Sequence, residues 1–304
     1  MKTIFRSLLN FGAGILAGFF ILSQFSFYDD NKTENTNKGS TLHQWYAPPI
    51  PDKLDFAGEN VPLDKWDVKE RLDRELLFNY YWQNNILYML KLANRYFPVI
   101  EERLKANGVP ADFKYLCIAE SNLLANATSR SGAVGFWQFL AGTAPGYQLE
   151  VNDKVDKRRD VIESTDAACK YLKQAYAKFG SWTAAAASYN CGMGGYNAKA
   201  TAQKTKNYYD LLLTDETHRY IFRILAFKHL MENAKELGFV LNKEDLYYPV
   251  KTRPVTISKS IPDLVQFAID NGTNYKTLKL LNPWLRSKSL TVRSGKSYTI
   301  LLPA

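Results

Sequence analysis

The chain has 304 residues, a formal net charge of +9 and 46% hydrophobic residues. This length allows one large domain or two smaller ones with separate cores, and the apolar content fits a globular protein. The positive charge suits an anionic partner such as nucleic acid, anionic lipid or a wall polymer, or else reflects a generally cationic surface. No basic run is long enough, or interleaved enough with aromatic residues, to favour nucleic acid.

A positively charged N-terminus precedes an apolar segment, with Lys2 and Arg6 followed by residues 8–27. This order is typical of an export signal or a membrane anchor, and roughly 20 apolar residues can span a bilayer. Residues 1–28 are therefore predicted to be a signal sequence or membrane anchor, and an uncleaved anchor is favoured because no clear cleavage site follows. A buried core helix is the less favoured alternative. Residues 29–53 are polar, end in prolines and predict a tether.

Helical patterns begin near Asp67 and continue to about residue 238. Apolar residues recur there at three- and four-residue steps, which predicts amphipathic helices. We expect these helices at residues 68–81 and 88–104, from about residue 110 to just past residue 120, and at residues 161–179, 182–189 and 217–238. Ser164 and Thr165 are expected to cap the fourth of them. The glycine-rich run after Cys191 predicts a turn.

The pattern changes after Pro249. Short strands are expected at residues 256–257 and 299–302, with helices at 261–271 and 274–281 between them. This β-α-α-β order within about 50 residues predicts a small separate domain. The expected division is thus a larger helical domain at residues 54–250 and a small one at residues 254–304.

The cysteines and histidines give no sign of a metal or redox centre. The three histidines have no paired metal-ligand spacing, so neither a metal nor a cofactor is expected. The cysteines lie in apolar or small-residue helical sequence, where buried, inert thiols are expected; a disulfide between two of them has no support. They are Cys117, Cys169 and Cys191.

Glu120 is the candidate catalytic group. It lies near the C-terminal end of the helix that begins near residue 110, on the inward face that it shares with apolar residues. A carboxylate on such a face is either paired or has its pKa shifted for acid catalysis. Asp156 and Asp160 are the only nearby acidic candidates for a second catalytic group, and their alternating-charge surroundings favour a salt-bridged loop.

Three further motifs follow Glu120 in order, at residues 131–139 (SGAVGFWQF), 187–192 (ASYNCG) and 216–220 (ETHRY). Two glycines in the first motif would let a loop pass close to a sugar, with hydrogen bonds from Ser131 and Gln138. The two aromatic residues before Gln138, Phe136 and Trp137, are either platforms on which a sugar stacks or core residues, and core is favoured for Phe136.

This series resembles the motifs of lytic transglycosylases of the goose-lysozyme-like superfamily, close to the membrane-bound type. Residues 56–63, 96–98 and 113–116 resemble that type too, and the similarity spans about residues 55–235. The resemblance implies a mainly α fold, with a lysozyme-like (goose-type) helical catalytic domain. It also implies a location in the cell envelope or periplasm, with the chain anchored to the membrane or else secreted. The expected partners are peptidoglycan glycan strands and, through the N-terminal segment, the membrane, but no nucleic acid.

The resemblance also implies the chemistry. Glu120 would protonate the leaving glycosidic oxygen and then, as a carboxylate, accept the proton of the 6-hydroxyl that attacks C1 of the same muramyl sugar. Tyr189 would be the second catalytic residue, as a partner of the carboxylate or of the developing positive charge. The residues expected to bind substrate are Ser131, Trp137, Gln138, Asn190, Glu216 and Tyr220.

Departures from the family pattern are small, and none removes a catalytic atom. Ser188 and Cys191 stand where the family usually has alanine, and Gln148 where glycine is common. Residues 254–304 resemble a LysM module, a wall-glycan binder, without its usual Gly-Asp turn. A hydrolysing muramidase and a non-catalytic peptidoglycan-binding scaffold remain the alternative functions.

Overall fold

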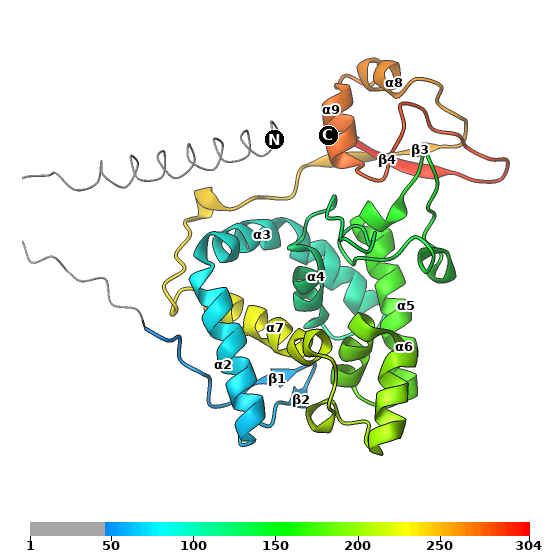
Figure 1. Ribbon diagram of the computed structural model, residues 1–304. Helices are drawn as coiled ribbons and strands as arrows, with labels where there is room; N and C mark the ends of the chain where they lie inside the picture. The colour runs from blue at the N-terminus through cyan, green and yellow to red at the C-terminus, as the bar shows by residue number, and fades with distance from the viewer. Residues whose placement is uncertain (1–45) are drawn as a thin grey trace, which may run out of the picture. The chain divides into compact units, whose positions relative to one another are not determined.

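The computed structural model describes residues 46–304, so the expected signal or anchor and most of the expected tether lie outside the described residues. Residues Ala47–Ala304 form one compact unit. It is mainly helical, with two small two-stranded antiparallel sheets (Figure 1). Among residues 46–304, no helix is both long enough and apolar enough to cross a membrane. The predicted fold class, mainly helical with a small β-containing domain, is confirmed.

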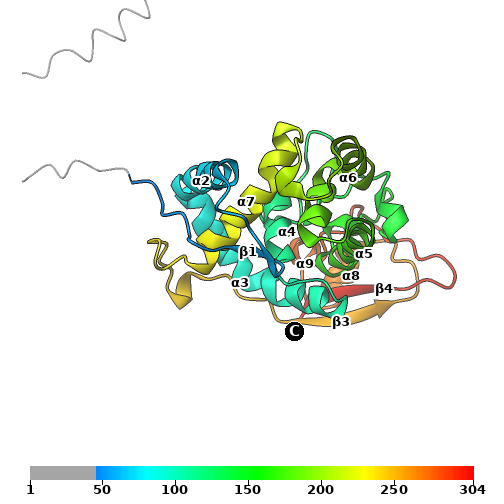
Figure 2. The same cartoon turned by 90° about the horizontal axis from the view of Figure 1, so that it is seen from below.

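Helix α7 (Asp215–Glu232) packs against α2 (Trp66–Tyr81) and against α4 (Phe113–Ser121), and Figures 1 and 2 place it between them. In α2 the buried side chains recur at three- and four-residue steps, as a one-sided core contact requires. This packing brings α2 and α7 close to the C-terminal end of α4, where Glu120 lies.

Helices α3 (Gln83–Ala106), α5 (Val161–Phe179) and α6 (Trp182–Gln203) complete the core, with α3 packed on α5 and α5 on α6. Helix α6 runs well beyond the predicted end at Tyr189. Gly192 has φ 75° and ψ 148°, so the helix breaks there and then resumes. The glycine-rich run therefore interrupts this helix but does not end it.

The predicted cap of α5 is wrong. Asp160 caps the helix, because its side chain accepts hydrogen bonds from the backbone N–H groups of Ile162 and Glu163. Ser164 and Thr165 lie buried in the first turn, where their hydroxyls donate to backbone carbonyls of the preceding turn. Asp160 directly precedes the first residue of α5, where its negative charge is stabilised by the positive end of the helix dipole.

Strands β1 (Asp55–Phe56) and β2 (Glu59–Asn60) form a hairpin that the sequence pattern did not predict. Its turn uses two residues with positive φ, Ala57 and Gly58. The Glu59 carboxylate accepts the backbone N–H groups of Trp182 and Thr183, at 2.6 and 2.8 Å, at the start of α6. The chain before this hairpin differs from a free tether, since Pro48 is buried and Ile50 packs on the core.

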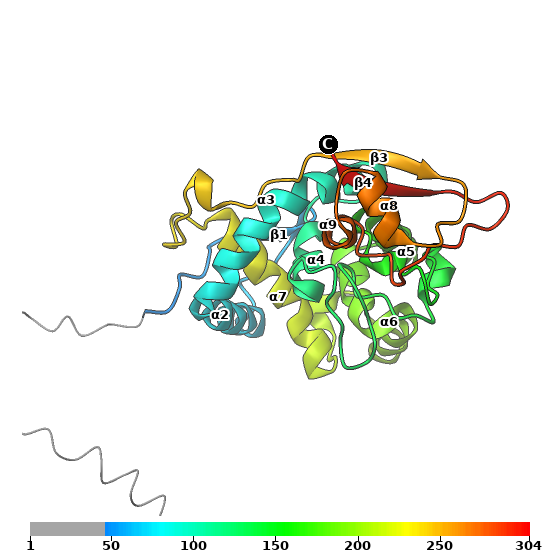
Figure 3. The same cartoon turned by 90° about the horizontal axis from the view of Figure 1, so that it is seen from above.

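The C-terminal module has the predicted β-α-α-β order. Strands β3 (Thr252–Ile257) and β4 (Tyr298–Pro303) pair antiparallel, with Val255 opposite Ile300. Helices α8 (Leu264–Asp270) and α9 (Tyr275–Leu281) come between the two strands in the sequence and lie beside them (Figure 3). One face of each element supplies the module's own core. Its fully buried side chains are Leu264, Ala268, Leu278, Ile300 and Leu302.

Residues 150–157 of the helical domain connect directly to this module. Val155 belongs to the module's core, and the Asp156 N–H donates to the Trp284 carbonyl at 2.9 Å. The Lys157 ammonium lies 3.7 Å from the centre of the Trp284 ring. The expected domain boundaries, residues 54–250 and 254–304, remain predictions. Residues 150–157 belong to the first of these ranges but also pack against the C-terminal module.

Candidate active site

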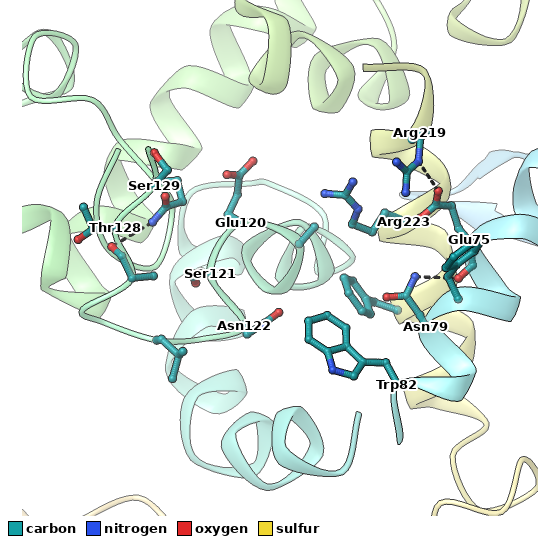
Figure 4. Close-up of a pocket in the computed structure, with 16 residues that line it drawn as sticks. Glu75, Asn79, Trp82, Glu120, Ser121, Asn122, Thr128, Ser129, Arg219 and Arg223 are labelled. Atoms are coloured by element: carbon teal, nitrogen blue, oxygen red, sulfur yellow. Dashed lines mark hydrogen bonds and ion pairs between the residues drawn. The ribbon is translucent and has the colours of Figure 1, made fainter. Parts of the chain in front are cut away.

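A pocket of about 750 Å³ opens beside the C-terminal end of α4. One wall consists of α2 and α7 residues, and the other is the loop after α4, residues 122–139, which we call the wall loop. Glu120 projects into the pocket from α4 (Figure 4). The arrangement places a single carboxylate at the junction of the two walls.

The environment of Glu120 raises the pKa of its carboxyl group to about 7. Burial is the main cause, because it disfavours the charged form. The Tyr220 hydroxyl, which donates a short hydrogen bond to Oε1, and the positive charge of Arg223 act in the opposite direction, whereas the charge of Glu216 adds to the rise. Near neutral pH the group can therefore act either as a proton donor or as a proton acceptor.

Two tyrosines lie near Glu120, and only Tyr220 donates to it. The Tyr189 hydroxyl donates instead to the Trp137 carbonyl, at 2.8 Å. Of the two roles expected for Tyr189, that of a hydrogen-bond donor to the carboxylate is corrected, because its hydroxyl donates to the Trp137 carbonyl. Its other expected role, as a partner of the developing positive charge, stays a prediction. Tyr189 remains within electrostatic reach, since the charge of Glu120 contributes to raising the pKa of Tyr189.

The wall loop is held against the segment before α5 by a close backbone approach. A Cβ atom at Gly135 would lie 1.9 Å from the Arg158 carbonyl oxygen, and φ at this glycine is +84°. The Arg158 guanidinium donates to the Phe139 carbonyl at 3.0 Å and is paired with Asp156 at 2.8 Å. Gly135 is therefore required for the wall loop to pack against the segment before α5.

Polar residues of the wall loop differ in their access to the pocket. Gln138 lines it, while its amide nitrogen donates to the Ala127 and Gly135 carbonyls at 3.2 and 2.9 Å. Ser131 is exposed and is not among the pocket-lining residues; its hydroxyl bonds that of Ser129, which does line the pocket, at 2.9 Å. Ser129 was not predicted from the sequence.

Trp137 is placed differently from the expectation of a sugar-stacking platform. Its ring is fully buried, and its indole N–H donates to the Thr165 hydroxyl at 2.9 Å. A ring without accessible faces cannot stack on a sugar, so Trp137 is a core residue. Phe136 is also buried, as favoured from the sequence.

Asn190, just before the break in α6, lies beside Glu216 in the first turn of α7. The Asn190 amide donates to Glu216 at 3.4 Å, and its oxygen accepts a bond from the Thr217 hydroxyl at 2.8 Å. Glu216 is exposed and Asn190 half-buried. Both were expected to bind substrate, but neither is among the residues that line the pocket, so that role stays a prediction.

The wall formed by α2 and α7 was not found from the sequence. Phe78 and Trp82 line the pocket with 63% and 52% of their surface exposed, so they offer aromatic faces where Trp137 does not. Glu75 is only 2% exposed, yet it lines the pocket and accepts a hydrogen bond from Arg219 at 2.7 Å. The sequence did contain a signal for this wall: two aromatic residues four apart, Phe78 and Trp82, lie off the apolar face of the predicted helix and are therefore expected to be exposed.

The other candidate acids lie away from this pocket. Asp156 is 5% exposed and paired with Arg158, while Asp160 caps α5 and pairs with Lys157 at 3.1 Å. This is the salt-bridged loop favoured from the sequence. The three cysteines are free thiols, and burial raises the pKa of each; Cys191 is the one that is only half-buried. Among residues 46–304, no group of three or more His, Cys, Asp or Glu residues could hold a metal ion.

Two protein-family profiles match this chain. Residues 97–212 match the transglycosylase SLT domain, and residues 253–304 match the soluble lytic transglycosylase C-terminal LysM-like domain. The chain contains an SLT domain. Its matched span includes Glu120, the wall loop and Tyr189, and it ends before Tyr220 and Arg223 on α7.

Curated proteins and a solved structure are also similar to this chain. Membrane-bound lytic murein transglycosylase D from two strains of Escherichia coli is 28% identical over 218 residues, which is 69% of this chain and 46% of the relative. The chain thus spans about half the length of the curated relatives it matches. An inactive mutant of lytic transglycosylase Slt from Pseudomonas aeruginosa aligns with a TM-score of 0.39 and 18% identity, over 50% of this chain and 26% of that one.

Proposed function

We propose that the chain is a peptidoglycan lytic transglycosylase. It would cleave the β-1,4 bond between N-acetylmuramic acid and N-acetylglucosamine and leave a 1,6-anhydro end on the muramyl sugar. The SLT domain and the name of the Escherichia coli relatives support the reaction class. The observation that carries the proposal is Glu120, a carboxyl group whose pKa is raised to about 7 and that lines a pocket of about 750 Å³.

The reaction needs one residue in two protonation states. Protonated Glu120 gives its proton to the glycosidic oxygen as the bond from that oxygen to C1 breaks. The muramyl 6-hydroxyl oxygen then forms a bond to C1, and its proton passes to the Glu120 carboxylate, which restores the acid. The attacking hydroxyl belongs to the same sugar, so its effective concentration is high and no bound water has to be activated.

The second carboxylate of the pocket does not suit a hydrolytic role. Glu75 is nearly inaccessible and accepts bonds from both Arg74 and Arg219, at 2.9 and 2.7 Å. Its charge is held by two guanidinium groups, and its side chain has almost no surface from which to reach a water molecule or a sugar. This favours the intramolecular route over the hydrolysing muramidase, which needs a second free carboxylate.

The other site residues take supporting roles in this proposal. Tyr220 orients the Glu120 carboxylate, and Tyr189 positions the wall loop through the Trp137 carbonyl. Gln138 offers its amide oxygen to the substrate, while Asn190 and Glu216 form a polar rim beyond the pocket.

Digestion of purified sacculi by the wild type and by Glu120→Gln tests the proposal. Mass spectrometry of the soluble products should show anhydro-muropeptides from the wild type and at least a 100-fold loss with the variant. Glu236→Gln, an exposed change at the end of the helical domain, is the matched control and should keep wild-type activity. Reducing ends without anhydro products would establish a muramidase, and sacculus binding without any Glu120-dependent cleavage would establish a scaffold.

We propose a location in the cell envelope, with the C-terminal LysM-like domain binding glycan. The LysM-like family match and the membrane-bound relative support these two statements. N-terminal sequencing of the mature protein from a membrane fraction should find the chain intact from its start. A mature N-terminus well past residue 28, in a soluble fraction, would refute the membrane anchor that we propose at residues 1–28.

A further inference from the structure

Two arginines of α7 face the pocket, and their partners differ. Arg219 donates to Glu75 at 2.7 Å. Arg223 lies one turn later and makes no hydrogen bond or ion pair with any other residue in the part of the chain that the structure describes, 46–304. Figure 4 shows Arg223 projecting from α7 toward Glu120, while Arg219 is turned to Glu75 on α2.

The charges of the pocket do not balance when Glu120 holds its proton. Four of the sixteen lining residues ionise: Glu75, Glu120, Arg219 and Arg223. Glu75 and Arg219 neutralise one another, so the acid form of the site leaves Arg223 as its one uncompensated charge among the lining residues. Glu216, the other carboxylate that acts on Glu120, is exposed beyond the pocket.

A half-buried guanidinium without a partner is a binding group for an anion. Its planar set of N–H donors matches the two oxygens of a carboxylate, and such charge-assisted pairs are about twice as strong as neutral hydrogen bonds. The muramyl sugar of the proposed substrate carries a lactyl ether, whose carboxyl group is either free or extended by a stem peptide with further carboxylates. A neutral N-acetylglucosamine oligomer has no such group.

We propose that Arg223 binds a carboxylate on the lactyl or stem-peptide substituent of the muramyl sugar, so that the pocket selects anionic glycans over neutral ones. This inference rests on the proposed function, because it names the part of that substrate which the site recognises. The position of Arg223 beside Glu120 puts the bound carboxylate next to the sugar that reacts. Phe78 and Trp82, on the same side of the pocket, supply uncharged contacts that a neutral glycan can use equally.

Binding is measured without turnover in the Glu120→Gln background, with and without Arg223→Gln, by calorimetry. Three probes separate the sources of the anion: a neutral N-acetylglucosamine oligomer, a peptide-free muramyl oligomer and the same oligomer with stem peptides. We expect Arg223→Gln to weaken muramyl binding about ten- to 100-fold. Binding of the neutral oligomer should change less than about twofold. Loss only with the peptide-bearing probe assigns the anion to the peptide, and loss only with the peptide-free probe assigns it to the lactyl carboxylate. Equal loss with both muramyl probes means that Arg223 binds whichever of the two carboxylates is present.

The result that overturns the inference is an equal change for neutral and anionic probes, or no change for either. Arg223→Lys, which keeps the charge and loses the planar donor set, should retain part of the preference and guards against a variant that fails to fold. A role limited to adjusting Glu120 would shift the pH profile of sacculus cleavage by Arg223→Gln but would leave probe selectivity intact. Failure of the proposed function is separate, since it appears as absent Glu120-dependent anhydro products in otherwise wild-type protein.

Discussion

Removing the Tyr220 hydroxyl isolates the interaction that holds the catalytic carboxyl group. This hydroxyl donates to Glu120 and lowers the pKa of the carboxyl, which burial has raised to about 7. A hydrogen bond to a charged group contributes about 1.5–3 kcal/mol, and one to the neutral acid about 0.5–1.5 kcal/mol. The difference is worth about 1.4 kcal/mol, or one pKa unit. Tyr220→Phe should therefore raise the pKa of Glu120 to about 8.

The expected sign follows from the protonated form being the active one. As pH rises through the pKa of Glu120, the general acid is lost and kcat/KM falls. At pH 8 the protonated fraction should increase from about a tenth in the wild type to about half in Tyr220→Phe. The assay is release of soluble anhydro products between pH 5 and 9, normalised to each protein's own maximum. Normalisation removes the loss of absolute rate from poorer orientation of the carboxyl.

Tyr189→Phe is the matched control for this experiment. Its hydroxyl donates to the Trp137 carbonyl, so the change should lower activity through the wall loop and leave the midpoint of the alkaline limb near pH 7. The reasoning is refuted if Tyr220→Phe leaves the midpoint in place or lowers it. It is also refuted if both variants shift the midpoint equally.

Three stability predictions come from the same geometry, each checked by urea denaturation. The folded state raises the pKa of Glu120 from 4.5 to about 7, so this group's stabilising contribution is complete below pH 4.5 and is lost as pH rises through 7. The free energy of unfolding of Glu120→Gln should therefore exceed that of the wild type by up to about 3 kcal/mol at pH 8 and should match it near pH 4. Gly135→Ala should cost more than about 2 kcal/mol because of the Arg158 carbonyl, whereas Gly132→Ala, with positive φ but open space, should cost about 1 kcal/mol; equal costs would contradict the close approach. Glu59→Ala should cost about 2 kcal/mol by removing the acceptor at the start of α6, and an unchanged midpoint would refute that role.

Helical periodicity predicted the elements whose buried face is continuous. Helices α2, α4 and α5 fall close to the expected residues because their apolar spacing reports one-sided burial directly. The hairpin at residues 55–60 was missed because strands of two residues have no measurable alternation. Helix α6 was predicted too short, since a glycine run normally ends a helix and here only Gly192 leaves the helical region.

The candidate site was predictable where its residues form a local motif. Glu120, Gln138 and Tyr220 come from such motifs, and all three meet at or beside the pocket. Which of two tyrosine hydroxyls reaches Glu120 depends on the packing of α4 against α7, and no local pattern encodes it. For the same reason Trp137 could not be assigned as core before its Thr165 partner was known.

The pocket contains two carboxylates, but their hydrogen-bond partners show that only one of them is available for catalysis. From the sequence Glu120 stands alone, but the structure adds Glu75 to the same pocket. Glu75 does not restore a two-carboxylate mechanism, because Arg219 and Arg74 already hold its charge in a nearly inaccessible position. Releasing a buried carboxylate from such pairs would cost several kcal/mol, and this cost would raise the barrier of any reaction that used Glu75 as the base. The lower-cost route is one in which the substrate supplies the nucleophile, and the single carboxyl group with a pKa near 7 is the one that this route requires.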